Sequence, residues 1–302
     1  MTMKISKNHS LLLLFGISIF ITSCSDSLSD TTDGRLRYWI STLSSDEFEG
    51  RAPGTEGGKL TKNFISKTFQ NLNLDPVNGS YFLDVPASEI TLKDSSYLTL
   101  SFRGNDRKMI TGEEVVFWTK QAREYRKIRD SEVVFVGYGI VAPEYNWNDY
   151  DGIDVKGKTV VILINDPGFA TGKLRLFNGK SMTYYGRWTY KFEEAARQGA
   201  AAAIVIHEEE PAAYPWSVVE NSWQGPQLDL QRDDLGADRV ILEGWIRDST
   251  LNDVLNFTGF NYDSLKEIAL EKTFSAFPLR GLTLSSEIHN KVRYLQSHNI
   301  AA

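Results

Sequence analysis

Residues 184–223, YYGRWTYKFEEAARQGAAAAIVIHEEEPAAYPWSVVENSW, decide the fold that this sequence predicts. Phe192 and Ala195 recur at helical spacing, and Gly199 can end that helix in a left-handed conformation. Residues 200–206 follow as a continuous run of small and β-branched residues without a polar face, which is typical of a strand covered on both sides. A helix followed by such a buried strand predicts an α/β fold.

The composition predicts a folded protein with one or two sizeable cores. The chain has 302 residues, of which 41% are hydrophobic and 12% aromatic, so it has enough apolar material to pack. Its net charge of -6 and the lack of a Lys/Arg run disfavour nucleic acid and anionic membrane surfaces as partners.

The N-terminus has the pattern of an export signal. Lys4 and Lys7 precede an apolar run at residues 11–21, which is too short to span a bilayer comfortably and ends in small residues. Residues 21–24, ITSC, resemble the lipobox of bacterial lipoproteins, which predicts lipidation at Cys24 and anchoring on a periplasmic or surface-facing membrane. The alternative is a secretory peptide with an incidental cysteine. Because Cys24 is the only cysteine, no disulfide can form within the chain.

Two helices are expected near the start of the folded part. Residues 25–33 are rich in Ser, Asp and Thr, which predicts a flexible tether. An amphipathic helix follows, with its apolar residues at Leu36, Trp39, Ile40 and Leu43. A second helix is expected after Thr55 as its cap, with an apolar stripe made by Leu60, Phe64, Ile65, Thr68 and Phe69.

The loop between these helices, residues 48–58, holds four glycines and a proline and predicts a turn with unusual backbone angles. Such a loop can cradle an anion, but a helix-entry turn also uses glycine for geometry alone. Both interpretations stay open. If the loop forms a substrate-cleft wall, Arg51, Gly54 and Thr55 are the candidate residues.

Alternation of residue types and turn signals predict the remaining elements, and a charged segment at residues 122–130 suggests a domain boundary. Asn105 and Asp106 are expected to form a hairpin tip. Strands are expected at residues 79–86, 97–102, 132–136, 159–164 and 281–288, and helices at residues 248–257 and 262–270.

Residues with possible chemistry admit simpler interpretations. His207 and the glutamates that follow could bind metal, but the helical zinc motif needs a second His at position 211, which is Pro, so a polar end of a buried strand is favoured. No nucleophile elbow and no Walker-type phosphate loop is present in the sequence. Four aromatic residues could stack a ligand or pack a core: Trp188, Tyr214, Trp216 and Trp223.

Several motifs resemble metallopeptidase family 28, the exported zinc aminopeptidases. FEGRAPGTEG at residues 48–57 and GSYFLDVP at residues 79–86 are similar to the N-terminal segment of that family. VVFVGYGI at residues 133–140, DYD at residues 149–151 and VKGKTVV at residues 155–161 resemble the protease-associated domain inserted in many members. The opening stretch matches one bacterial subgroup particularly closely.

This resemblance implies a protease-associated β/α domain inserted into the N-terminal part of an incomplete α/β/α aminopeptidase-like domain. The expected boundaries are a lipoprotein signal peptide at 1–24, a tether at 25–33, peptidase-domain parts at 34–125 and 276–302, and the protease-associated domain at 126–275.

The resemblance also implies two zinc ions in a full-length member, which removes N-terminal amino acids from peptides. The family's ligands are a His-x-Asp pair, a bridging Asp, a Glu-Glu pair, a further acidic residue and a final His, all downstream of the inserted domain. Downstream here, His289 is followed by Asn290, and His298 by Asn299, so no ligand can be assigned. We therefore expect this chain to bind no zinc and to be inactive alone. The alternative is a stand-alone surface lipoprotein that binds peptides or proteins through the protease-associated domain.

Overall fold

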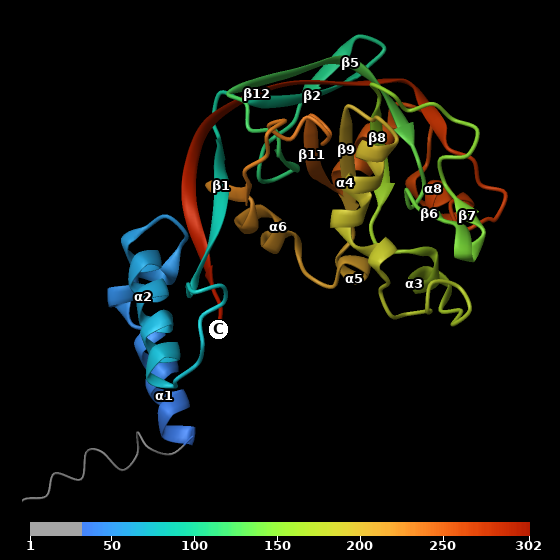
Figure 1. Cartoon of the computed structure of the whole chain (residues 1–302). Coiled ribbons are helices and arrows are strands. Elements are labelled where there is room, and N and C mark those ends of the chain that lie inside the picture. The colour runs from blue at the N-terminus through green and yellow to red at the C-terminus, as the bar shows by residue number, and fades with distance from the viewer. Residues whose placement is uncertain (1–31) are drawn as a thin grey trace, which may run out of the picture. The chain divides into compact units, whose positions relative to one another are not determined.

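The computed structural model describes residues 32–302, so the signal peptide, most of the tether and the predicted lipidation site Cys24 lie outside the described residues. The described chain forms two compact units, of which the first ends at Asp75 and the second spans Pro76–Ala301 (Figure 1). No helix within residues 32–302 is long and apolar enough to cross a membrane.

The first unit contains both predicted helices. They are α1 (Thr32–Leu43) and α2 (Glu56–Asn71), separated by the 3-10 helix η1 (Asp46–Arg51). The Thr55 hydroxyl accepts a hydrogen bond of 3.2 Å from the Gly58 amide, which confirms Thr55 as the cap of α2. Phe48 is buried against the edge of the Phe64 ring at a centroid distance of 6.0 Å. No residue of α1 is buried, and α2 buries only Gly57 and Ser66.

The second unit is built on a large mixed sheet with the strand order β10-β1-β12-β5-β8-β9-β11-β4. Strands β2 and β3 extend this sheet beside β12, and β6 and β7 form a separate two-stranded sheet. The strands of the unit are β1 (Phe82–Leu92), β2 (Tyr97–Phe102), β3 (Asn105–Lys108), β4 (Val115–Trp118), β5 (Tyr125–Phe135), β6 (Val141–Ala142), β7 (Trp147–Asn148), β8 (Thr159–Leu163), β9 (Ala202–His207), β10 (Pro226–Leu230), β11 (Leu242–Arg247) and β12 (Phe277–Ile300). Its helices are α3 (Pro167–Thr171), η2 (Pro143–Tyr145), η3 (Tyr184–Gly186), α4 (Trp188–Arg197), α5 (Glu209–Ala212), α6 (Trp216–Ser222), α7 (Asp248–Asn256) and α8 (Tyr262–Ile268).

The predicted helix and buried strand at residues 184–223 lie at the centre of this unit and are confirmed as α4 and β9. Gly199 ends the helix with φ +78°, as expected for a left-handed terminating residue. β9 pairs in parallel with β8 on one side and β11 on the other, and every residue of β9 is buried. A strand with parallel neighbours on both sides and helices over the sheet has no solvent-facing side, which explains its run of apolar residues.

Both faces of the sheet are covered. Alternate residues of β5 belong to different hydrophobic clusters, since Val133 packs in one and Val134 in the other. α4 contributes Phe192 to the second cluster, whereas α7 contributes Leu251 and α8 contributes Leu265 to the first. The second unit is therefore an α/β fold with helices on both faces of its parallel strands, which confirms the predicted α/β class (Figure 1). The insertion of a protease-associated domain stays a prediction.

Two sequence expectations differ from the structure. Phe102 pairs with Asn105, so the hairpin turn lies at Arg103 and Gly104, and the prediction of a tip at Asn105 and Asp106 is wrong. Both turn residues have positive φ, +50° and +81°, and glycine favours that conformation. The strand expected at residues 281–288 is only part of the 24-residue β12, which pairs with β1, β2 and β5. The domain boundaries at 125/126 and 275/276 stay predictions.

Candidate functional site

A pocket of about 290 Å³ lies in the second unit where the parallel strands β8 and β9 end. We call it the carboxyl-end pocket; its lining residues are Tyr138, Leu163, Ile164, Asn165, Asp166, Phe169, Ala170, Lys180, Glu208, Glu210, Pro211, Lys266 and Leu270. In α/β sheets, the carboxyl ends of parallel strands are the edge where ligands commonly bind, because loops of several elements converge there. The pocket is therefore the first candidate site.

The inner wall of this pocket is held by buried hydrogen bonds. The Asp166 carboxylate is fully buried and accepts hydrogen bonds from the amides of Gly168 and Phe169 and from the amide and hydroxyl of Thr183. Asn165 donates to the Pro211 carbonyl at 2.8 Å. The polar side chains of Asp166 and Asn165 already form hydrogen bonds within the protein. They therefore fix the shape of the wall, and other side chains of the pocket are the candidates for ligand contact.

A buried lysine supports the same wall from behind. Lys191 of α4 is fully buried, and its Nζ donates to the carbonyls of Tyr138 at 2.6 Å and Asn165 at 2.8 Å. Burial lowers the pKa of Lys191, and the nearby carboxylates of Asp149 and Asp166 oppose that shift. Burial likewise raises the pKa of Asp149, whose carboxylate accepts from the Ile140 amide and the Trp147 indole. Lys191 thus joins the turn after β5 to the end of β8.

His207 occupies the end of β9, where its ring is buried. Its Nε2 lies 3.1 Å from the Tyr214 carbonyl oxygen, and the ring packs edge-on against Trp216 and Trp245. Burial lowers the pKa of His207, so the imidazole is neutral at pH 7. The interpretation of His207 as the polar end of a buried strand is confirmed.

The four aromatic residues singled out from the sequence divide between core and surface. Trp216 is buried and its indole donates to the Gly112 carbonyl at 2.7 Å, so it packs the core. Trp188, Tyr214 and Trp223 line a second pocket of about 190 Å³, together with Val218, Val219, Ser222 and Trp245. Trp223 also stacks on Trp118 with ring centroids 3.4 Å apart. The sequence did not identify Trp118 or Trp245, because strands far from residues 184–223 bring them there.

The glycine-rich loop has a structural reason for its glycines in the first unit. A Cβ on Gly57 would lie 2.0 Å from the Phe48 carbonyl oxygen, so the loop backbone packs directly on the start of α2. Arg51 has φ +65° and donates to the Leu43 carbonyl, and Gly54 has φ +75°. These contacts favour the turn interpretation for the loop. A cleft-wall role for Arg51, Gly54 and Thr55 stays a prediction.

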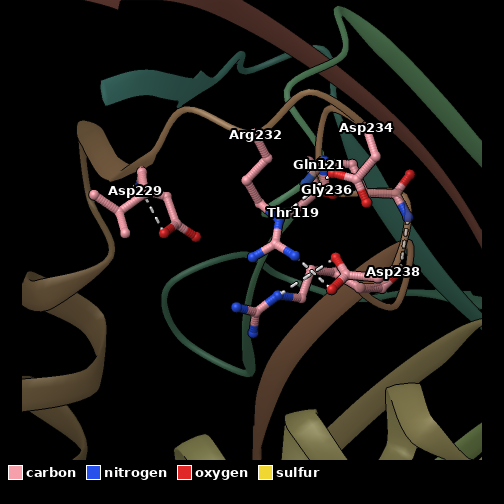
Figure 2. Close-up of polar contacts among 9 residues, drawn as sticks. Thr119, Gln121, Asp229, Arg232, Asp234, Gly236 and Asp238 are labelled. Carbon is pink, nitrogen blue, oxygen red and sulfur yellow. Dashed lines mark hydrogen bonds and ion pairs between the residues drawn. The ribbon is translucent and has the colours of Figure 1, made fainter. Parts of the chain in front are cut away.

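The polar connection between β10 and β11 is a third feature of the second unit, and Figure 2 shows it closely. The Arg232 guanidinium lies 2.6 Å from the Asp238 carboxylate and 3.5 Å from that of Asp234, which in turn accepts from the Gly236 amide at 2.9 Å (Figure 2). Gln121 ties the connection to the segment after β4 by donating to the Arg239 carbonyl at 2.8 Å. Both arginines of this connection pair with aspartates inside it, since Arg239 also lies 3.9 Å from Asp238, so these ion pairs hold the segment in its conformation.

The described residues, 32–302, do not fit the zinc centre that the resemblance implies. Within residues 32–302, no group of three or more His, Cys, Asp and Glu side chains is placed to hold a metal ion. His289 lies 3.8 Å from a carboxylate oxygen of Glu287, and His298 lies 3.3 Å from one of Asp84. A catalytic zinc needs three protein ligands, so no zinc chemistry is derived from these residues.

Two aminopeptidases are among the solved structures that this chain resembles. No protein-family profile and no curated protein matches the sequence. The aminopeptidase from Aneurinibacillus sp. strain AM-1 is 17% identical with a TM-score of 0.39, and the match covers 86% of this chain and 48% of that one. BSAP, a zinc aminopeptidase from Bacillus subtilis, is 14% identical with a TM-score of 0.29 and coverages of 87% and 45%. The chain spans about half the length of these structures.

Proposed function

We propose that this chain is the N-terminal and protease-associated portion of a lipid-anchored zinc aminopeptidase of metallopeptidase family 28, and that it is inactive without a separate segment that carries the zinc ligands. The sequence motifs at residues 48–57, 79–86 and 133–161 support the family, and the α/β fold agrees with it. The proposal includes export, lipidation at Cys24 and a location on a periplasmic or surface-facing membrane.

The observation that carries this proposal is the exposed apolar face of the first unit. Leu36 is 47% exposed and Ile40 66%, and their spacing of four residues puts them on the same face of α1. A helix of this length gains most of its stability by packing an apolar stripe against a partner. The apolar residues of α2, including Phe64 and Phe69, are also only partly buried. Helices with this pattern are parts of a larger layered domain, and the sheet of a peptidase domain is a partner of the required kind.

A second candidate is a stand-alone binding module, which the second unit favours. This unit has apolar clusters on both faces of its sheet and pockets lined by its own residues, so its fold does not depend on a further segment for its core. On this alternative the protein captures peptides or a partner protein at the membrane surface without hydrolysing them.

Activity measurements test the first proposal. A soluble form without the signal peptide and Cys24, residues 25–302, is purified and supplied with zinc or cobalt, and release of amino acids from peptide substrates is compared with a chelated control. We expect no metal-dependent turnover. Turnover above the chelated control would refute the inactivity of this chain. Lipidation would be rejected if mass spectrometry of the full-length protein, isolated from the cells that export it, found an unmodified Cys24.

Hydrogen exchange separates the two candidates. In the isolated chain, the peptidase-fragment proposal predicts rapid amide exchange in α1 and α2 and slow exchange in β8 and β9, because only the second unit has a closed core. A chain extended by the downstream coding sequence, if that sequence encodes a His-x-Asp motif, should protect α1 and α2. Equal protection of α1, α2 and the central strands in the isolated chain would favour the binding module instead.

A further inference from the structure

The carboxyl-end pocket combines an apolar floor with a charged rim. Phe169, Pro211 and Leu270 are partly exposed and give the floor its apolar surface, and the volume of about 290 Å³ lies at the lower limit for small-molecule sites. The wall is fixed by Lys191 and Asp166, whose polar atoms are already bonded within the protein. The floor therefore suits a small apolar group, and the charged side chains at the rim are the ones that can bind polar groups of a ligand.

The rim carries both signs of charge, supplied by two Lys–Glu pairs. Lys266 lies 2.8 Å from the Glu208 carboxylate and 3.4 Å from that of Asp263, so its ammonium group is already engaged by two carboxylates. This inner pair closes one side of the pocket.

The outer pair is different because its two charges are near each other but not bonded. Lys180 Nζ and Glu210 Oε1 lie 4.0 Å apart, beyond hydrogen-bond distance, and their side chains are 64% and 83% exposed. Lys180 is held over the Phe169 ring at 4.4 Å from its centroid, which places its ammonium group at the pocket. Lys180 and Glu210 can therefore separate, and each can bind a ligand group of the opposite charge.

We propose that the carboxyl-end pocket binds a free α-amino acid with an apolar side chain. Lys180 receives the ligand carboxylate, Glu210 receives its ammonium group, and the side chain packs on the floor made by Phe169, Pro211 and Leu270. In an α-amino acid, the two charged groups are joined through one carbon, so they can meet two opposite charges that are themselves only a few ångströms apart. The site belongs to the second unit and does not depend on peptidase activity.

Isothermal titration of the full chain with L-leucine tests this assignment. We expect saturable binding below about 10 mM, with affinity lost about tenfold in Lys180→Met and in Glu210→Gln, as removal of one charge-assisted hydrogen bond predicts. Glu209→Gln and Lys173→Met are the matched controls, since both residues are exposed and do not line the pocket; they should bind like the unaltered chain. Ala170→Phe narrows the pocket at its lining and should abolish binding.

Ligand analogues separate the two charges. L-leucinamide lacks the carboxylate and N-acetyl-L-leucine lacks the ammonium group, so each should bind at least about tenfold more weakly than L-leucine. L-leucyl-L-leucine holds its charges further apart and should also bind more weakly. The proposal is overturned if L-leucine does not bind, if either analogue or the dipeptide binds as tightly, or if the control variants lose affinity as much as Lys180→Met.

Discussion

Replacement of Lys191 by methionine should lower the free energy of unfolding by about 3–5 kcal/mol. The Lys191 side chain lies wholly inside the second unit, and its ammonium group donates to two backbone carbonyls. It is also a nearby cation for the buried Asp149 carboxylate. Methionine has a similar length but can neither donate a hydrogen bond nor balance a charge.

The magnitude follows from what Lys191→Met leaves behind. The carbonyls of Tyr138 and Asn165 lose the donor at 2.6 and 2.8 Å, and a buried acceptor left unsatisfied costs about 1–3 kcal/mol. Asp149, which is only 2% exposed, loses its compensating cation. The cost of burying the lysine itself is relieved in the variant, which keeps the net loss near the value for breaking a buried pair, about 3–5 kcal/mol.

Urea unfolding followed by tryptophan fluorescence measures this loss, because Trp147, Trp216 and Trp245 are buried in the second unit. Lys173→Met is the matched control and should stay within about 0.5 kcal/mol of the unaltered chain. Adding Asp149→Asn to Lys191→Met should restore part of the loss, since the uncompensated carboxylate is removed. A loss below about 1 kcal/mol, or strictly additive single changes, would refute the assigned role of Lys191.

Three further predictions concern burial and backbone packing. Because burial depresses the pKa of His207 below its ordinary 6.5, the unfolded chain binds a proton more readily than the folded chain, and stability falls as the pH drops below 6.5. In urea titrations at successive pH values, His207→Gln should reduce this fall in stability. An unchanged dependence of stability on pH would contradict the prediction. Gly57→Ala forces a Cβ against the Phe48 carbonyl and should destabilise the first unit by about 1–3 kcal/mol, seen as faster amide exchange in α2, whereas Lys59→Ala should not. Asp166→Ala leaves buried amide donors unpaired and should cost about 2–4 kcal/mol in chemical unfolding, and a loss no greater than that of an exposed Asp253→Ala would count against this role.

Local features of this fold were predictable because each depends on residues close in sequence. Gly199 ends α4, Thr55 caps α2, and the apolar run of β9 is buried as expected. The hairpin tip at Asn105 was wrong by two residues because Gly104 supplies the positive φ that the turn needs. Such caps and turns depend on the backbone preferences of a few adjacent residues, which can be read directly from the sequence.

The candidate site required contacts between distant segments. Lys180, Glu208 and Lys266 lie in three separate parts of the chain, and only the sheet order brings them to one pocket. For His207 and its glutamates the sequence favoured a polar strand end over a metal site, but it gave no sign that Glu208 and Glu210 line a pocket beside the buried histidine.

The sequence by itself determined the α/β class, the buried character of β9 and the caps and turns around it, because hydrophobic periodicity and backbone preferences are local properties. Only the tertiary structure decided that Lys191 is buried and donates hydrogen bonds to two backbone carbonyls, and that Lys180 and Glu210 lie close together. A lysine on a helix is ordinarily solvated, and its burial depends on the carbonyls and carboxylates that long-range strand pairing places around it.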